Sequence, residues 1–421
     1  MNTRLFALAL ASTALVGLPA LAADKTAVLE TYADIAAAGY EDSLVTARAL
    51  QQAVAALLAA PSEETLAAAK TAWLASRVPY QQTEVYRFGN AIVDDWEGKV
   101  NAWPLDEGLI DYVDTSYGEA SDENEYRILN VIANPSFELS GAPVDASEIT
   151  PELIAETLHE ADENEANVAS GYHAIEFLLW GQDLNGTGPG AGNRPYSDYI
   201  QSEGCTGGNC DRRAAYLSAA TELLVSDLEY MAAAWAEGGE GRAAVLADEN
   251  AGITAMLTGM GSLSYGEQAG ERMKLGLMLN DPEEEHDCFS DNTHNSHYYD
   301  GLGIRNVYLG SYTRIDGSTV SGPSLSALVA AADPAVDAEL KTDLDATVAA
   351  LDELVKAAEG GKAYDMMLAP GNAEGEALIT AAVGGLVKQT QAIERAVTAL
   401  GVSGITFEGS DSLDNPSAVF Q

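Results

Sequence analysis

The chain of 421 residues is long enough to form two domains of ordinary size, each with a hydrophobic core. It contains 65 acidic residues and only 21 basic ones, which gives a formal net charge of −44. An electric field of that sign repels DNA, RNA and anionic membranes and attracts cations, so nucleic acids are excluded as partners. Adaptation to salt or high solubility is the simpler explanation of this charge, with recruitment of cations as a by-product.

The chain begins with a segment typical of a secretory signal peptide. Arg4 is followed by the apolar run 5–18 and by the small-residue site Ala20-Leu21-Ala22. We therefore expect residues 1–22 to be removed and the mature protein to lie in the periplasm or cell envelope. No cysteine follows the cleavage site, so we expect no lipid anchor, and no later segment is apolar enough to span a membrane.

Apolar residues recur at helical spacing along the mature chain, and alternating runs of β-branched residues are almost absent. The sequence therefore predicts an all-α fold. Ser62 and Thr150, the latter followed by proline, are the expected N-caps of two helices. The expected helices cover residues 36–60, 63–78, 151–180, 212–235, 244–279, 335–358 and 376–400.

Two polar segments interrupt this pattern. Residues 181–199 are rich in glycine and proline, and residues 281–306 are rich in histidine, aspartate and asparagine. Long loops in a compact helical protein are usually functional or disordered, and the aromatic side chains of the second segment argue against disorder. We place a domain boundary at the cysteine loop between them, which gives one domain of residues 23–204 and another of residues 205–421.

Three cysteines are present. Cys205 and Cys210 lie in the short loop "EGCTGGNC", which can close a local disulfide in an oxidising compartment. Cys288 lies among possible metal ligands, although a single cysteine is more often a small buried apolar residue.

The stretch "GYHAIEFLLWGQD", residues 171–183, places His173 and Glu176 three positions apart in an apolar run. Residues at this spacing share one face of a helix. An imidazole nitrogen and a carboxylate oxygen together suit zinc, iron, manganese or copper, but two ligands are too few for a tight site. A histidine hydrogen-bonded to its helical neighbour inside a core would give the same pattern, so both interpretations stay open.

Other acidic and histidine residues gather in three further motifs. "VPYQQTEVYRFGN" contains Glu84, and "NAWPLDEGLIDY" contains Asp106 and Glu107. Side chains from both halves could converge on one cleft, because helical bundles build sites from facing helices. Each motif could equally be a solvated acidic face. The third motif, "EEEHDCFSDNTH", supplies the candidates Glu283, Glu285, His286, Asp291 and His294.

Taken together, these motifs resemble those of the imelysin-like proteins, grouped as peptidase family M75. The family signature GxHxxE falls on Gly171, His173 and Glu176, and the similarity extends over most of the mature chain. The family is envelope-associated and includes iron-regulated proteins and one described as insulin-cleaving. The resemblance implies two helical bundles related by pseudo-symmetry, with the signature lining the cleft between them. It also implies Glu84 and Asp106 as further metal ligands. Gly171, Glu107, His286, Asp291 and His294 are secondary candidates for the cleft.

The first functional hypothesis is a periplasmic metal-binding protein of iron uptake. His173 and Glu176 would bind a divalent or trivalent ion or its chelate, iron first, with zinc and copper as alternatives, and an envelope iron-transport component would be the partner. The pair would be buried on one side and exposed to the cleft on the other. Because a neutral imidazole binds the metal, affinity should fall below the ordinary histidine pKa of ~6.5.

Two other classes of function remain. A metallopeptidase would use a metal-bound water, with Glu84 or Glu107 as the general base, although no arrangement of two histidines and a base is visible in the sequence. A binding module for a polysaccharide or haem would use the aromatic residues of the cleft and would bind its ligand without a metal.

Overall fold

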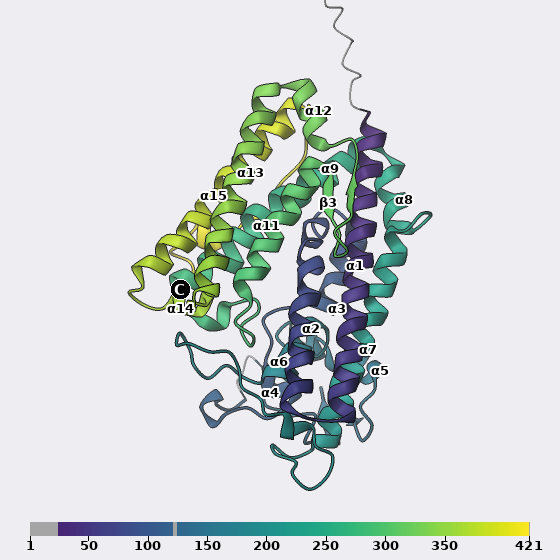
Figure 1. Ribbon diagram of the computed structural model, residues 1–421, viewed down its shortest axis with the longest axis vertical. Helices are drawn as coiled ribbons and strands as arrows, with labels where there is room; N and C mark the ends of the chain where they lie inside the picture. The colour runs from purple at the N-terminus through teal and green to yellow at the C-terminus, as the bar shows by residue number, and fades with distance from the viewer. Residues whose placement is uncertain (1–23, 121–123, 421) are drawn as a thin grey trace, which may run out of the picture.

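The computed structural model describes residues 24–120 and 124–420, and nearly all of its regular structure is helical (Figure 1). The predicted all-α fold is confirmed, since the described strands form only two short antiparallel hairpins. The predicted signal peptide lies outside the described residues. Among those residues, no helix combines the length and the apolar character that crossing a membrane requires.

The first group of helices packs around α1, the long purple helix of Figure 1. Helix α1 contacts both α2 and α7, and α6 packs against α2, α3 and α7. Aromatic rings fill the centre of this group, with the Tyr32 and Tyr86 centroids 4.6 Å apart and those of Tyr86 and Trp235 5.4 Å apart. The helices are α1 (Lys25–Ala59), α2 (Glu63–Gln81), α3 (Ala91–Asn101), α6 (Gly171–Trp180), α7 (Cys210–Trp235) and α8 (Glu240–Ala247).

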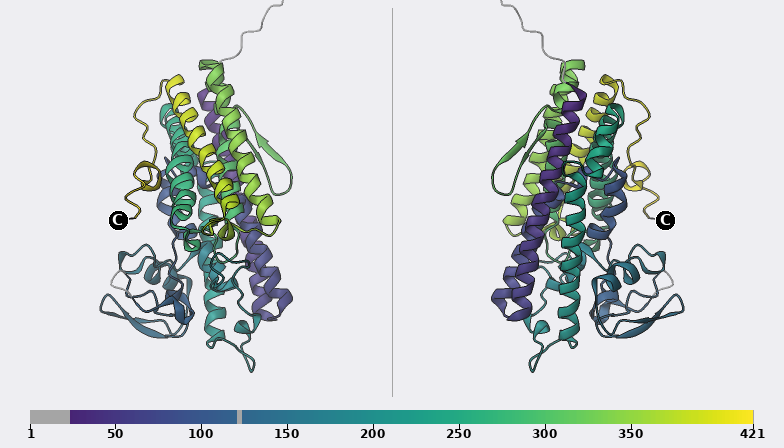
Figure 2. Two further views of the ribbon diagram at one scale, coloured as in Figure 1. Left: turned by 90° about the vertical axis from the view of Figure 1, so that its left-hand side faces the viewer. Right: turned by 90° about the vertical axis from the view of Figure 1, so that its right-hand side faces the viewer.

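The second group forms the green and yellow half of the molecule (Figures 1 and 2). Helix α13 packs against α11 and α15, and α15 also packs against the π-helical segment η6 that continues α9. Helix α11 additionally contacts α2 and so joins the two groups. The helices are α9 (Glu249–Ser262), η6 (Leu263–Leu275), α10 (Gly276–Leu279), α11 (Thr293–Leu309), α12 (Leu325–Ala332), α13 (Pro334–Glu359), α14 (Tyr364–Leu368), α15 (Ala373–Ala399) and α16 (Asp411–Asp414).

Short elements connect these helices. The β1–β2 hairpin precedes α5, and the β3–β4 hairpin follows α11 and packs on α1. The connecting elements are η1 (Glu84–Tyr86), α4 (Glu107–Ile110), η2 (Thr115–Tyr117), β1 (Ser136–Leu139), β2 (Ala142–Asp145), α5 (Pro151–Leu153), η3 (Ile154–Leu158), η4 (Ala161–Glu163), η5 (Tyr196–Tyr199), η7 (Pro282–Glu284), β3 (Ser311–Thr313) and β4 (Thr319–Ser321).

The helices do not change groups at the cysteine loop where the sequence places a boundary. Helix α7 begins at the second cysteine of that loop and packs on α1, because its buried residues Leu217, Leu224 and Trp235 join the core of the first group. The change comes in α9, which contacts α1, η6 and α15. The cysteine loop itself is closed by a disulfide between Cys205 and Cys210, whose Cα atoms are 6.0 Å apart.

Two predicted elements differ from the structure. Residues 151–180 do not form one helix, because the backbone turns at Glu160, Asp162 and Glu163, which all have positive φ, and helix resumes only at α6. Residues 281–306 are not a single loop, since α11 begins within them. The polarity that suggested a loop belongs to buried side chains such as His297 and Asp300, which have no exposed surface and pack inside the protein rather than facing water.

Candidate metal centre

Helix α6 begins at a glycine that no other residue could replace without strain. Gly171 has φ +80°, and a Cβ atom there would overlap the carbonyl group of Val100 on α3. Glycine tolerates both the positive φ and the close approach of two backbones. The preceding Ser170 donates its hydroxyl to the Lys99 carbonyl at 2.8 Å, so the first turn of α6 is anchored directly to α3. Gly171, the first residue of the GxHxxE signature, therefore fixes the position of His173, the third.

His173 and Glu176 share a hydrogen bond along one face of α6. Nδ1 of His173 lies 3.1 Å from Oε2 of Glu176, and Oε1 of Glu176 accepts a hydrogen bond from the backbone N–H of Ser290 at 2.9 Å. Both side chains have 0% exposed surface, so the prediction that one side of the pair is exposed to the cleft is wrong. Nε2 of His173 is buried and has no hydrogen-bond partner among the described residues.

The segment between η7 and α11 brings two further donors to His173. The His286 ring centroid lies 4.8 Å from that of His173, and Oδ1 of Asp287 lies 3.9 Å from His173 Nδ1. His173, His286 and Asp287 each offer one ligand atom, and these atoms lie within 4.8 Å of one another. The sequence identifies His286 as a candidate but not Asp287, although the two are neighbours in the same motif. The one signal for Asp287 in the sequence is its position beside His286.

Asp287 is held by a set of buried hydrogen bonds. Its carboxylate accepts from Arg77 Nη2 at 2.8 Å and Nε at 3.3 Å, from Asn292 at 2.7 Å and from the Ser296 hydroxyl at 2.5 Å. Burial would raise the pKa of Asp287, but Arg77, then His173 and Ser296, lower it below the usual value. Asp287 is therefore a fixed, ionised carboxylate beside the two imidazoles.

The protonation of the centre suits metal ligation. Burial, followed by the charge of Arg77, lowers the pKa of His173 to about 3, and burial with Arg272 lowers that of His286 well below its ordinary value. Both imidazoles are therefore neutral at neutral pH, which is the form that binds metals. Burial and the neighbouring Asp287 raise the pKa of Glu176 well above the ordinary value for a carboxyl group.

Two histidines and one carboxylate fit a transition-metal ion. This donor set is the one that non-haem ferrous sites use, and zinc and copper accept the same ligands. Neighbouring ligands of one such ion lie about 3.0–3.6 Å apart at metal–ligand distances of about 2.0–2.2 Å. The three ligand atoms, which lie within 4.8 Å of one another, would have to close by up to about 1.5 Å. The Arg77 guanidinium opposes a cation here, and Asp287 offsets that charge.

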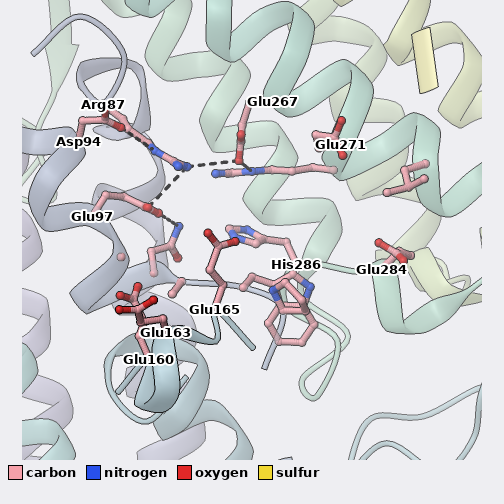
Figure 3. Close-up of a pocket in the computed structure, with 17 residues that line it drawn as sticks. Arg87, Asp94, Glu97, Glu160, Glu163, Glu165, Glu267, Glu271, Glu284 and His286 are labelled. Carbon is pink, nitrogen blue, oxygen red and sulfur yellow. Dashed lines mark hydrogen bonds and ion pairs between the residues drawn. The ribbon is translucent and has the colours of Figure 1, made fainter. Parts of the chain in front are cut away.

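An acidic cleft of about 770 Å³ lies between the two groups of helices and is bordered by His286 (Figure 3). His286 and Trp103 line this cleft and also contact His173, whose ring centroid is 5.0 Å from that of Trp103. Arg87 and Arg272 neutralise part of its charge, the latter through a 2.8 Å ion pair with Glu267. The carboxylates that line it are Asp94, Glu97, Glu160, Glu163, Glu165, Glu267, Glu271 and Glu284.

Two expected ligands lie apart from the centre. Glu84 is buried and forms a 2.7 Å ion pair with Arg272, so its charge is already compensated. Asp106 precedes α4, where it accepts hydrogen bonds from Tyr117 and Asn124. Neither belongs to the group of possible ligands around His173 in the described chain. Their motifs suggest a place in the cleft and the family resemblance implies that they are ligands, but packing gives them other partners.

The secondary candidates are also divided among different places. Glu107 is buried and lines a separate small pocket, together with Asp183, Glu285 and Asp365. Asp291 forms an acidic group with Asp183 and Asp365. His294 lies 3.1 Å from the side-chain nitrogen of its neighbour Asn295, and burial lowers its pKa to about 4. Only Gly171 and His286, of the secondary candidates, lie at the centre built around His173.

Comparison with known proteins agrees with this arrangement of helices. Residues 36–393 match the family model of imelysin, peptidase family M75, and the chain belongs to that family. A structure from Parabacteroides distasonis, described as an iron-regulated protein A precursor, superposes with a TM-score of 0.66 at 19% identity, covering 91% of this chain and 97% of that one. An imelysin-like protein from Psychrobacter arcticum superposes with a TM-score of 0.58 at 16% identity, covering 92% and 100% of the two chains. No curated protein matches the chain.

Proposed function

We propose that this protein binds a metal ion in the cell envelope and serves iron uptake, with the metal or its chelate held at the centre around His173. The observation that carries the proposal is the buried Nε2 atom of His173, which lacks a hydrogen bond and lies in a side chain adjacent to His286 and Asp287. Burying a polar atom without a partner costs roughly 1–3 kcal/mol, and a metal ligated by that nitrogen would remove this cost.

Each residue has a separate role in this proposal. His173, His286 and Asp287 would bind the ion. Its positive charge would compensate the carboxylate of Asp287, which in the metal-free protein is compensated by Arg77. Ionised Glu176 would accept the Nδ1–H of His173 and so direct Nε2 toward the metal, as carboxylates behind metal-bound histidines do. The backbone N–H of Ser290 would keep Glu176 in place.

The acidic cleft supports the same function by concentrating cations. Its eight carboxylates outnumber the two arginines that line it, and they come from both groups of helices. A cleft lined by one sign of charge raises the local concentration of the opposite ion and its rate of association. His286 lies both on the cleft and in the metal group, so an ion from the cleft would meet this residue before His173. Iron is favoured because the similar Parabacteroides structure is described as an iron-regulated protein.

The alternatives receive less support. For a metallopeptidase, the expected general bases are Glu84, which is paired with Arg272, and Glu107, which lines a different pocket. For a haem or polysaccharide module, the cleft offers many carboxylates and a single aromatic ring, that of Trp103, among its described lining residues.

The test begins with elemental analysis of the protein and titration of the stripped protein with ferrous, ferric, zinc and copper ions. Wild type should bind one ion per chain, and His286→Ala should abolish this binding. Glu271→Gln serves as the matched control, because it removes a cleft carboxylate but no proposed ligand, and it should retain stoichiometric binding. Equal binding by His286→Ala and wild type would contradict the proposal. Metal-dependent cleavage of a denatured protein, lost in His173→Ala, would place the peptidase first.

A further inference from the structure

A second group of carboxylates includes Asp291, from the same segment that carries His286. Asp183 follows α6, Asp291 precedes α11, and Asp365 lies at the start of α14, so the group joins parts of both helical groups. One carboxylate oxygen from each of the three lies within 4.8 Å of the others. None of the three is a member of the group around His173.

Glu285 adds to this acidic group a buried carboxylate that has no hydrogen-bond partner among the described residues. It is 1% exposed, and neither of its carboxylate oxygens has a hydrogen bond within the described chain. Glu285 lines the same small pocket as Asp183 and Asp365. A buried carboxylate left without a partner is costly unless a cation or another donor compensates it.

No basic side chain does so in the part of the chain that the structure describes. The residues that line the pocket are Glu107, Asp183, Gly186, Pro282, Glu283, Glu285, Cys288, Phe289 and Asp365. The charges that act most strongly on Asp291 are those of Asp365 and Asp183, which both raise its pKa. The pocket is therefore a local concentration of acidic side chains, with no basic residue among its described lining residues.

We propose that Asp183, Asp291, Asp365 and Glu285 bind a calcium ion. Four carboxylates can supply four to eight oxygens, and Ca²⁺ takes six to eight oxygens at about 2.3–2.6 Å. Oxygens bound to one Ca²⁺ lie about 3–5 Å apart, so aspartate oxygens within 4.8 Å of one another can share one ion after small adjustments. Mg²⁺ binds oxygens at about 2.0–2.1 Å and retains several waters, so a site built from four carboxylates suits Ca²⁺ better.

A bound Ca²⁺ would link the two groups of helices. Asp183 lies three residues beyond the end of α6, and Asp365 belongs to α14 in the second group of helices. Glu285 immediately precedes His286. An ion held by these residues would fix both segments that carry the centre around His173, without being a ligand of that centre.

The experiment uses the full mature chain after treatment with a chelator. Equilibrium dialysis with radioactive Ca²⁺ should find one ion per chain with a Kd below about 1 mM, the range of extracellular calcium modules, and Ca²⁺ should raise the Tm. The variant with Asp291→Asn and Asp365→Asn should bind at least ~100-fold more weakly, because affinity depends on the number of charged ligands. Removing two repelling charges should leave its calcium-free Tm at or above that of wild type, which reports correct folding.

Two controls separate this site from the first. His173→Ala should keep its calcium affinity, and Glu163→Gln, which removes a carboxylate of the cleft, should keep it too. Failure of wild type to bind Ca²⁺ at millimolar concentration would overturn the proposal, as would unchanged Ca²⁺ affinity in the double variant. Magnesium binding as tight as that of calcium would overturn the assignment of the site to calcium. Should the double variant fail to fold, Glu285→Gln alone should still weaken Ca²⁺ binding by about tenfold.

Discussion

Replacement of His173 by alanine should lower stability and remove metal-dependent stabilisation, and the two effects can be measured separately. The substitution leaves Oε2 of the fully buried Glu176 without its 3.1 Å partner, which costs roughly 1–3 kcal/mol. It also removes a buried ring that contacts Trp103 and His286 at centroid distances of 5.0 and 4.8 Å. Loss of the unpaired Nε2 offsets part of this cost, so we expect a loss of about 2–4 kcal/mol in the metal-free protein.

The metal-dependent part follows from linkage. A ligand present at 100 times its Kd stabilises the folded state by about 2.7 kcal/mol, provided that it binds only that state. Wild type should show this increment in urea unfolding followed by circular dichroism, and His173→Ala should show none. His159→Ala is the control, because His159 is also largely buried, its Nδ1 accepts a 3.3 Å hydrogen bond from the Ala169 backbone, and it lies outside the metal group.

Three results are possible, and only one agrees with the account. The expected result is that both variants lose stability while His159→Ala keeps the metal increment. A metal-free His173→Ala protein as stable as wild type would refute the burial argument. A metal increment that survives in His173→Ala would refute the assignment of this side chain as a ligand.

Three further changes test the surroundings of the centre. Gly171→Ala should lower the free energy of unfolding in urea by about 1–3 kcal/mol more than Gly141→Ala does. Both glycines have positive φ, but only a side chain at Gly171 would meet the backbone of α3. Equal losses of stability would contradict this close approach of α6 to α3. His173 should stay neutral between pH 7 and pH 5 in the NMR spectrum of histidine-labelled protein, since its pKa is lowered from 6.5 to about 3. Its contribution to stability is complete above pH 6.5 and should be lost progressively as the pH falls from 6.5 to about 3. Titration of His173 near pH 6.5 would show that the ring is solvated. Metal binding at neutral pH should release a proton from Glu176, because the pKa of this side chain is raised in the metal-free protein. Calorimetry of metal binding in two buffers of different ionisation enthalpy should detect this proton in wild type and not in Glu176→Gln.

The sequence predicts the helices better than the site. Regular apolar spacing and the caps at Ser62 and Thr150 identify α2 and the start of α5, because these signals are local. The signature around His173 also stands out, since a histidine and a glutamate in an apolar run need an explanation wherever they occur. The positive φ values at Glu160 and Asp162 left no such signal, and they break a stretch that looks continuously helical.

The rest of the centre depends on contacts between residues far apart in the chain. Asp287 reaches α6 because Arg77, 210 residues earlier, holds its carboxylate, and nothing in the motif around Asp287 shows that partner. Glu84 is paired for the same kind of reason, since Arg272 approaches it from the second group of helices. The segment of residues 281–306 looked like a solvated loop because burial of polar side chains is invisible in composition.

The most direct test of the central claim is anomalous diffraction from crystals of the metal-loaded protein, collected at the absorption edges of iron and of zinc. The account predicts one strong peak per chain, within about 2.0–2.3 Å of an imidazole nitrogen of His173 and of one from His286, with Asp287 beside it. A peak at another place in the chain, or none in protein shown by elemental analysis to contain the metal, would contradict it.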